Sequence, residues 1–199
     1  VASAQELASV MQKLQNNTEE LLNIELAANI DLSSTNWAAY EAKTPFILDG
    51  KGYTISGLTA NSVKNDGFDN VGMFCSTYKA AVFKNLIVEG AKITGSGVDN
   101  CHGAVLVATP RGVLKVNHVT VKNATISNCD RSSVLVAYLY FNNAEIANTH
   151  IEGCTVNSIG TAGAFLGMAN NHNLKVSDSK VHNTTISSSE GGSKAGIYL

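Results

Sequence analysis

The chain has 199 residues, of which 44% are hydrophobic and 15% are charged, and its formal net charge is -2. A chain of this kind can bury a large core, and it lacks the basic surface that nucleic acids or anionic membranes attract, so we expect no nucleic-acid binding. No stretch approaches the roughly 20 consecutive apolar residues that cross a bilayer, and we expect no membrane insertion.

The first element that the sequence predicts is an amphipathic helix. Residues 3–22 place apolar side chains near helical spacing, at Leu7, Val10, Met11, Leu14, Leu21 and Leu22. Ser3 followed by Glu6 has the spacing of a capping box, which marks a helix N-terminus. We therefore predict that residues 1–22 form a helical cap over the open end of the single domain that residues 23–199 build.

Strand patterns follow the helix. Residues 24–26 and 30–32 alternate apolar and polar side chains, and residues 46–58 have the form of a strand, a glycine-rich turn and a second strand. These segments differ from the later part of the sequence, as terminal units of a repeat array usually do. We expect them to form the first coils of the domain.

From Phe83 onward the chain repeats itself. Four segments align without gaps, and their first residues, 33, 30 and 30 positions apart, are Phe83, Val116, Ile146 and Val176. A unit of this length cannot bury its own apolar face and must stack on its neighbours, which indicates a solenoid. A second apolar run recurs at a similar period, at Phe74, Leu106, Val136 and Leu166.

Each repeat also contains a corner. The corner position is occupied in turn by Gly90, Asn123, Gly153 and Asn183. Gly and Asn tolerate positive φ best, so this column predicts a repeated sharp bend between short strands. We predict an all-β, single-stranded parallel β-helix with coils of about 30 residues and an N-terminal capping helix. The alternative is a leucine-rich-repeat-like solenoid, whose spacing residues 116–126 fit, although the return segment 94–114 has no helical pattern.

A family resemblance supports the β-helix. The stretches -NIELAANIDLSSTNW- and -FILDGKGYTISGL- are followed by short apolar runs flanked by glycine, of which residues 163–167 fit best. In these features the chain resembles bacterial secreted right-handed parallel β-helix proteins that carry GLUG repeats. The resemblance implies a pectin-lyase-like fold on an exported, adhesin-like protein, with no catalytic residue and no cofactor to carry over. The start at Val1 fits a mature form without its secretory leader, so we expect a secreted or cell-surface location.

Four residues are weak candidates for catalysis. Asp99 and Asp130 belong to equivalent loops of adjacent repeats, beside His102 and Arg131, so stacking can bring their side chains together. A lyase or hydrolase on this fold needs clustered carboxylates with a basic residue, or two carboxylates at catalytic separation. Because no motif fixes a pair among the four, we assign no catalytic residue from the sequence.

Two polar columns predict ladders along the stack. One outward column contains Glu89, Lys122, Glu152 and His182. It is typical of a solvated charge ladder, with a charged groove for a glycan as the alternative. A second column, which we expect to hydrogen-bond along the stack, contains Asn85, His118, Asn148 and Asp178. No histidine or cysteine pair has metal-ligand spacing, so we predict neither a metal site nor a cofactor.

The four cysteines do not form a disulfide framework by their spacing. Cys154 takes a small-residue position that faces the core, and we predict a buried free thiol there. Cys101 and Cys129 precede equivalent apolar runs in adjacent repeats. A disulfide between them is compatible with the sequence but is not required by it.

The apolar runs do not alternate with polar residues. Residues 104–107 and 134–137 are apolar throughout, which is the pattern of a strand covered on both faces. The N-terminal helix, a loop or another protein chain can supply the cover. A strip left bare would favour self-association through this apolar wall.

Three functions are compatible with the sequence. The leading prediction is a non-enzymatic extracellular or cell-surface module for binding or adhesion, with a glycan or a protein as its ligand. The second is a carbohydrate-active enzyme, a polysaccharide lyase or hydrolase, that acts through the four candidate residues above. The third is a structural or filament subunit that stacks end to end, because the sequence stops inside a coil at Leu199 and leaves an unpaired strand edge.

Overall fold

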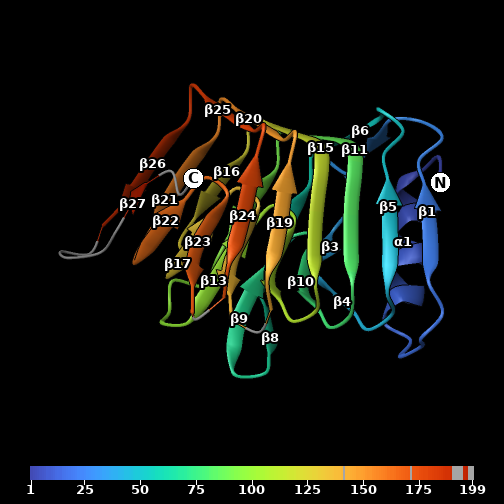
Figure 1. Cartoon of the computed structure of the whole chain (residues 1–199), viewed down its shortest axis with the longest axis horizontal. Coiled ribbons are helices and arrows are strands. Elements are labelled where there is room, and N and C mark those ends of the chain that lie inside the picture. The colour runs from blue at the N-terminus through green and yellow to red at the C-terminus, as the bar shows by residue number, and fades with distance from the viewer. Residues whose placement is uncertain (141, 171, 190–194, 197–199) are drawn as a thin grey trace.

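The computed structural model describes residues 1–140, 142–170, 172–189 and 195–196. The chain winds into an all-β, right-handed parallel β-helix of about five turns, with one short helix at its N-terminal end (Figure 1). The β-helix prediction is therefore confirmed. The leucine-rich-repeat alternative is excluded, because the return segment of each coil forms strands instead of a helix. Among the described residues, none of the helices has the length and apolar character needed to cross a membrane.

The strands stack into four sheets, which we call A to D. Sheet A contains β1 (Leu22–Glu25), β5 (Phe46–Asp49), β11 (Ala81–Glu89), β15 (Leu114–Lys122), β19 (Ala144–Ala147) and β24 (Leu174–Ser177), together with the short strands β2 (Ile30–Asp31), β6 (Thr54–Ser56), β20 (His150–Glu152) and β25 (Lys180–His182). Sheet B contains β3 (Trp37–Ala38), β7 (Thr59–Asn61), β12 (Lys92–Thr94), β16 (Thr125–Ser127), β21 (Thr155–Ser158) and β26 (Thr185–Ser188).

The return segment of each coil supplies the other two sheets. Sheet D contains β8 (Val63–Asn65), β9 (Phe68–Val71), β13 (Cys101–Ala104), β17 (Arg131–Ser133), β22 (Thr161–Gly163) and β27 (Ala195–Gly196). Sheet C contains β4 (Tyr40–Ala42), β10 (Phe74–Thr77), β14 (Val107–Pro110), β18 (Val136–Leu139) and β23 (Leu166–Ala169). The predicted final apolar run covered residues 196–199, of which 197–199 lie outside the described residues.

The register of sheet A confirms the repeat alignment. Phe83 pairs with Val116, Val116 with Ile146, and Ile146 with Val176. The predicted charge column is in register as well, because its four members pair in sequence, Glu89, Lys122, Glu152 and His182. One apolar position per repeat was therefore enough to fix the stacking of this sheet.

In sheet C the predicted alignment was wrong by one residue. Phe74 pairs with Val107, not with Leu106, and Val107 pairs with Val136. Val105, Leu106 and Val107 are all fully buried, because the tight turn between sheets D and C lies inside the molecule. An apolar pattern with no polar position in it cannot decide between neighbouring registers.

Two columns of left-handed residues turn the chain, one between sheets A and B and one within the outline of sheet A. The predicted corner column has positive φ values of 65°, 53°, 63° and 46°, at Gly90, Asn123, Gly153 and Asn183. The second column, predicted as a hydrogen-bonding ladder, is also left-handed, with φ values of 50°, 52°, 49° and 49° at Asn85, His118, Asn148 and Asp178. Its members are polar because short polar side chains tolerate this backbone region.

Substitution of Gly90 tests the corner. A Cβ atom at Gly90 would meet nothing within 4 Å, so Gly90→Ala adds backbone strain and no clash. We expect it to lower the unfolding free energy by about 1–2 kcal/mol. Gly90→Asn should lower it by less than about 0.5 kcal/mol, because Asn123 and Asn183 hold the same corner in other coils. Chemical denaturation of both variants measures the difference, and equal losses would contradict the assignment.

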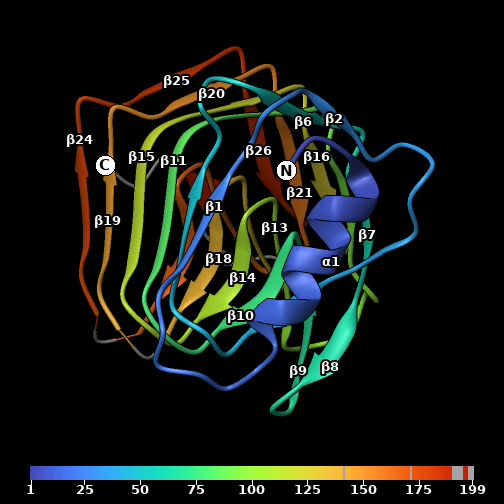
Figure 2. The same cartoon turned by 90° about the vertical axis from the view of Figure 1, so that its right-hand side faces the viewer.

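The N-terminal helix, α1 (Ala4–Leu14), is shorter than the predicted periodic segment. Ser3 accepts a hydrogen bond from the Glu6 backbone N–H, so the predicted N-cap is confirmed. The helix ends at Leu14, whose carbonyl accepts the backbone N–H groups of Lys43 and Thr44. Leu22 already begins β1. The buried residues of α1 pack over β4 and cover the N-terminal end of the coil interior (Figure 2).

A β-hairpin completes sheet D at the same end. In the first coil only Ala39 separates β3 from β4, so that coil supplies no strand to sheet D. The strand β8 lies in the vacant place and pairs antiparallel with β9 of the next coil. The hairpin β8–β9 projects from the stack of coils in Figures 1 and 2. It thus protects an edge that would otherwise be open.

Sheet C lies inside the outline of the coil, between sheet A and sheet D (Figure 2). Every residue of β10, β14 and β18 is buried. The apolar runs without alternation predicted a strand covered on both faces, and sheet D of the same chain is the layer that covers them. Residues 104–107 and 134–137 are fully buried. Self-association stays a prediction.

Candidate functional site

Sheets D and C face each other across the turn that joins them. We call the side chains that meet there the D–C seam, which comprises Asn70, His102, Thr109, Arg131 and Tyr138. The Nδ1 atom of His102 lies 2.9 Å from Oγ1 of Thr109, and Thr109 donates a hydrogen bond of 2.9 Å to Oδ1 of Asn70. The seam therefore joins neighbouring coils and neighbouring sheets at once.

The hydrogen bonds determine the state of His102. Arg131 has only donors, so its Nη1, 2.9 Å from Nε2 of His102, requires that Nε2 be unprotonated. Nδ1 then carries the proton and donates it to Thr109, whose own hydroxyl proton goes to Asn70. Burial, and next the charge of Arg131, lower the pKa of His102 to about 3. The imidazole is neutral throughout the physiological pH range.

Arg131 is held from several sides. Its Nη1 lies 3.0 Å from Oδ2 of Asp130 and donates to Oδ1 of Asn100 at 3.2 Å. Its guanidinium stands 4.7 Å from the centre of the Tyr138 ring. Asp130 balances the charge of the guanidinium, Asn100 orients it, and Tyr138 stacks on it. Arg131 therefore links these side chains and is not available to bind an anion.

The tip of the hairpin is bonded to residues that follow two strands of sheet C. Asp66 forms an ion pair of 2.8 Å with Arg111, which follows β14. It also accepts a hydrogen bond of 2.7 Å from the Tyr78 hydroxyl. Burial, together with the bond to Asp66, raises the pKa of Tyr78 to about 12. These contacts tie β8–β9 to sheet C and hold the hairpin in one position.

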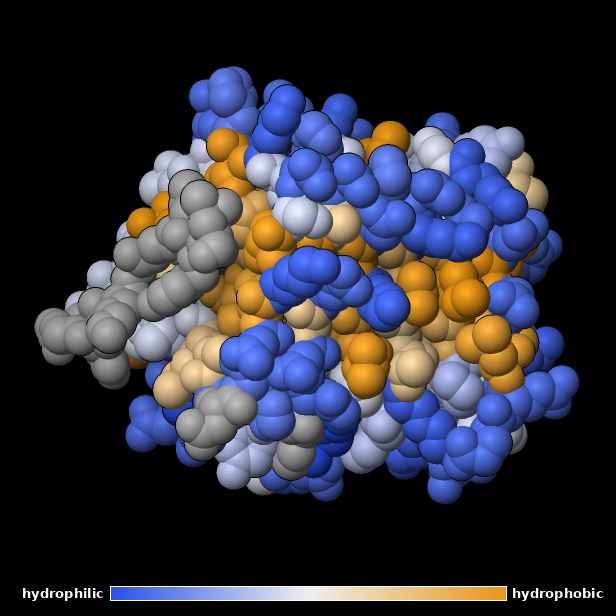
Figure 3. All heavy atoms as spheres, in the orientation of Figure 1, coloured by the Kyte–Doolittle hydropathy of each residue, from blue (hydrophilic) through white to orange (hydrophobic). Residues whose placement is uncertain are grey.

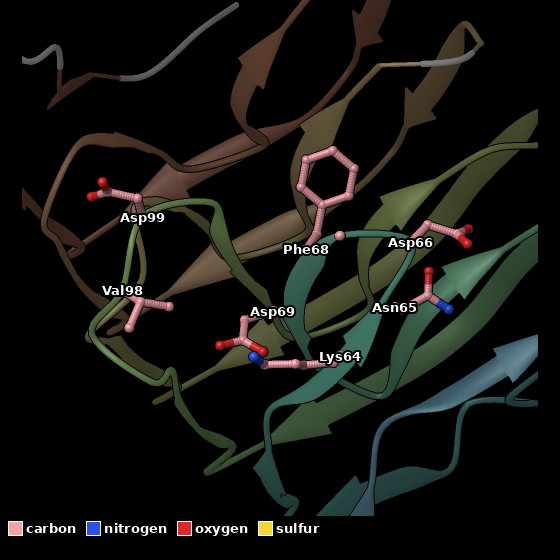
Figure 4. Close-up of a pocket in the computed structure, with 8 residues that line it drawn as sticks. Lys64, Asn65, Asp66, Phe68, Asp69, Val98 and Asp99 are labelled. Atoms are coloured by element: carbon pink, nitrogen blue, oxygen red, sulfur yellow. The ribbon is translucent and has the colours of Figure 1, made fainter.

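An open pocket lies between the hairpin and the loop of residues 96–100 (Figure 4). We call it the hairpin pocket; its volume is about 290 Å³, and it is lined by Lys64, Asn65, Asp66, Gly67, Phe68, Asp69, Val98 and Asp99. The carboxylates come from both of its sides, as Figure 4 shows. Asp69 accepts a hydrogen bond of 2.6 Å from Ser96, which ties the hairpin to the loop. Phe68 is half-buried, with its ring 4.7 Å from that of His102.

The structure brings together three of the four predicted candidates. Arg131 contacts both His102 and Asp130, and Oδ2 of Asp130 also accepts the backbone N–H of Asn100, at 3.3 Å. Asp99 does not join them. It is exposed and lines the hairpin pocket, so its carboxylate belongs to a different part of the surface.

This arrangement does not suit acid–base catalysis. His102 is fully buried and both of its ring nitrogens are engaged, so it cannot take a proton from a bound molecule. Asp130 is paired with Arg131. Within the described part of the chain, no three His, Cys, Asp or Glu side chains are grouped as metal ligands. The seam is a largely buried, fixed cluster of polar and aromatic groups.

Sequence reasoning missed the partners that give His102 its environment. Thr109 and Tyr138 lie on sheet C, and Asn70 lies on sheet D, where it pairs with His102 and so takes the same position one coil earlier. Phe68 lies on the hairpin, which has no counterpart in the later repeats. The one signal that pointed here was the lack of alternation in the apolar runs, since it required a covering layer.

The outer face of sheet A is a second accessible surface (Figure 3). Apolar residues gather across the middle of this face and hydrophilic residues lie among and around them. Glu145 forms ion pairs with Lys175, at 3.2 Å, and with Lys115, at 3.9 Å, which is a solvated ladder of the kind that contributes little free energy. An open hollow of about 460 Å³ beside it follows β20 and β25, lined by His150, Ile151, Glu152, Lys180, Val181 and His182.

Comparison with known proteins gives a likeness of fold alone. No protein-family model matches the sequence, and no curated protein matches it. A crystal structure from Bacteroides ovatus, of a protein described as "a putative immunoglobulin A1 protease", aligns over 100% of this chain and 82% of its own. The two chains are 11% identical and the TM-score is 0.43, a level that carries no inference about activity. The GLUG-type, pectin-lyase-like relationship stays a prediction.

Proposed function

We propose that this protein is a non-enzymatic module of the cell surface or the extracellular space, and that its hairpin pocket binds a glycan of neutral or amino sugars. The observation that carries the proposal is the lining of the pocket. Three carboxylates and the ammonium group of Lys64 line it on a rigid frame, while the ring of Phe68 points away from Lys64 and Asp69 and packs against His102 (Figure 4). Carboxylate acceptors and an ammonium donor are suited to a sugar, which presents hydroxyl groups around its rim.

The charges of the pocket select among glycans. Asp66, Asp69 and Asp99 contribute three carboxylates against the single ammonium group of Lys64. The negative field repels uronates and sulfated sugars and favours neutral or cationic ones. Asp66 is already paired with Arg111, so the groups most available to a ligand are those of Asp99 and Lys64, both exposed.

The scaffold supports binding without a large rearrangement. The hairpin is tied to sheet C through Asp66 and to the loop through Asp69, so both walls of the pocket are in place before a ligand arrives. A preformed site loses little conformational entropy on binding. Repetition of coils then gives a long rigid body that holds this site away from a surface to which the protein is attached.

The other two candidate functions have less support. A polysaccharide lyase or hydrolase would need a titratable group in contact with substrate, whereas His102 is buried and neutral and Asp130 is paired. Stacking of subunits end to end would need two open ends, whereas α1 covers the N-terminal end of the coils. No observation favours either candidate over binding.

Binding to an array of neutral, amino and acidic oligosaccharides tests the proposal. We expect retention of neutral or amino-sugar chains and weak retention of polyuronates. Asp99→Ala and Lys64→Ala should each weaken binding of the retained glycan about tenfold in calorimetry, because each loses a charge-assisted hydrogen bond. Both side chains are exposed, so the fold should be unaffected.

Two matched variants serve as controls. Glu89→Ala and Lys92→Ala remove one exposed carboxylate and one exposed ammonium group from sheets A and B, away from the pocket. They should leave the affinity unchanged. The proposal fails if no glycan is retained, if uronates are preferred, if only proteins bind, or if the control variants weaken binding as much as the pocket variants.

A further inference from the structure

Two of the four cysteines lie against each other across adjacent coils. A Cβ atom built on Gly95 would stand 2.5 Å from the sulfur of Cys101 and 2.4 Å from the sulfur of Cys129. The two sulfur atoms are therefore close neighbours. Both residues are fully buried, Cys101 at the start of β13 and Cys129 just before β17. Cys101 and Cys129 are one step off direct register, because His102 pairs with Arg131.

Glycines make room for this pair. A side chain at Gly95 would collide with both sulfurs, and one at Gly103 would stand 2.4 Å from the sulfur of Cys129. Neither position can therefore carry a side chain while the sulfurs keep their places. The space is built for two sulfur atoms in contact.

The two thiols also differ in acidity. The thiol of Cys129 hydrogen-bonds to the sulfur of Cys101, which lowers the pKa of Cys101 to about 7 and raises that of Cys129. By contrast, burial raises the pKa of Cys75 to about 12 and also raises that of Cys154. Cys101 is thus the nucleophile of the pair, since the thiolate is the form that attacks a disulfide.

We propose that Cys101 and Cys129 close a disulfide bond that joins the third coil to the fourth, formed by exchange with an external disulfide in an oxidising compartment. The thiolate of Cys101 attacks one sulfur of the external disulfide and releases the first thiol. Cys129 loses its proton and displaces the second thiol, which leaves the internal S–S bond. Two electrons and two protons pass to the external disulfide, which becomes two thiols. Secreted and surface proteins meet such conditions during folding, before these residues are buried.

Thiol mapping of the full chain tests the proposal. The protein is unfolded, refolded with oxidised and reduced glutathione, alkylated under denaturing conditions and digested. We expect an intact mass, measured before alkylation, about 2 Da below that of the reduced protein. After alkylation we expect two modified cysteines, Cys75 and Cys154, and one cross-linked peptide pair that contains Cys101 and Cys129. The midpoint of thermal unfolding should be about 5–10 °C higher for the oxidised than for the reduced chain.

Matched variants separate this pair from the other thiols. Cys101→Ala and Cys129→Ala should abolish both the cross-link and the thermal shift, whereas Cys75→Ala and Cys154→Ala should keep both. Four alkylated cysteines in the refolded wild type, or a cross-link to Cys75 or Cys154, would overturn the proposal. Because the mapping is done on the wild type, it decides the matter even where a variant does not fold. It is also independent of any ligand of the hairpin pocket.

Discussion

Lowering the pH from 6.5 to about 3 should remove as much as about 4 kcal/mol of unfolding free energy through His102 alone. In the unfolded chain the imidazole takes up a proton below its ordinary pKa of 6.5, whereas in the folded chain it does so only near pH 3. The unfolded state therefore binds more protons throughout this window. Stability is complete above pH 6.5 and is lost progressively as the pH falls.

The measurement is best made above the range in which carboxylates titrate. Urea denaturation at intervals between pH 7 and pH 4.5 should show a slope that approaches about 1.4 kcal/mol per pH unit below pH 5.5. His102→Gln should be less stable at pH 7 but nearly flat over the same range. Its amide can still accept from Arg131 and donate to Thr109, and it has no proton to gain.

His118→Asn is the matched control. His118 is exposed and left-handed, and Asn85 and Asn148 occupy the same position in neighbouring coils, so asparagine should be accepted there. We expect this variant to keep the acid dependence of the wild type. A wild-type slope in His102→Gln, or a His102 resonance that titrates near pH 6.5, would show that the seam does not bury a neutral imidazole.

The fold could be predicted at positions where every coil requires the same type of residue. Each coil needs one inward apolar residue at the start of its sheet A strand and one left-handed corner, so Phe83 and Gly90 recur as equivalents through the later repeats. The amino-acid types at such positions are narrowly restricted by burial or by φ. Their periodicity alone therefore gives the stacking and the coil length.

The return segment could not be predicted in the same detail. Sheet C is buried on both faces, so its sequence has no polar position to mark the register, and the alignment slipped from Val107 to Leu106. The hairpin β8–β9 takes the place of the sheet D strand that the first coil lacks. This irregularity occurs once, so the repeat pattern of the sequence gives no sign of it. Helical periodicity likewise continued past Leu14, where tertiary bonds from Lys43 and Thr44 end the helix.

The site was predicted only as a set of residues in equivalent loops. His102, Asp130 and Arg131 are close in the structure, as stacking required, but their roles depend on side chains from another sheet. Thr109 and Tyr138 turn His102 from a candidate base into a buried neutral group. Whether the coil folds back on itself, and so brings sheet C against sheet D, is a long-range feature that spacing along the chain does not encode.

Phe74→Ala should lower the unfolding free energy by about 3–5 kcal/mol. Phe74 is fully buried between sheets C and A, and its ring centroid lies 5.1 Å from that of Phe46 and 5.8 Å from that of Phe83. Truncation removes the contacts of one ring with two others and leaves a cavity that the surrounding strands cannot fill, because each strand is held on both sides by its neighbours in the sheet. Equilibrium denaturation in urea measures the loss.

Two further substitutions show whether the loss comes from the A–C core. Phe74→Leu should lose no more than about 1.5 kcal/mol, since Val107, Val136 and Leu166 fill the same position in later coils. Phe68→Ala should lose about 1–2 kcal/mol, because this ring is half-buried at the hairpin pocket. If Phe68→Ala were as damaging as Phe74→Ala, the hairpin would be part of the main core. It would then be a poor place for a ligand, because a core side chain cannot turn toward a bound sugar without unfolding its neighbours.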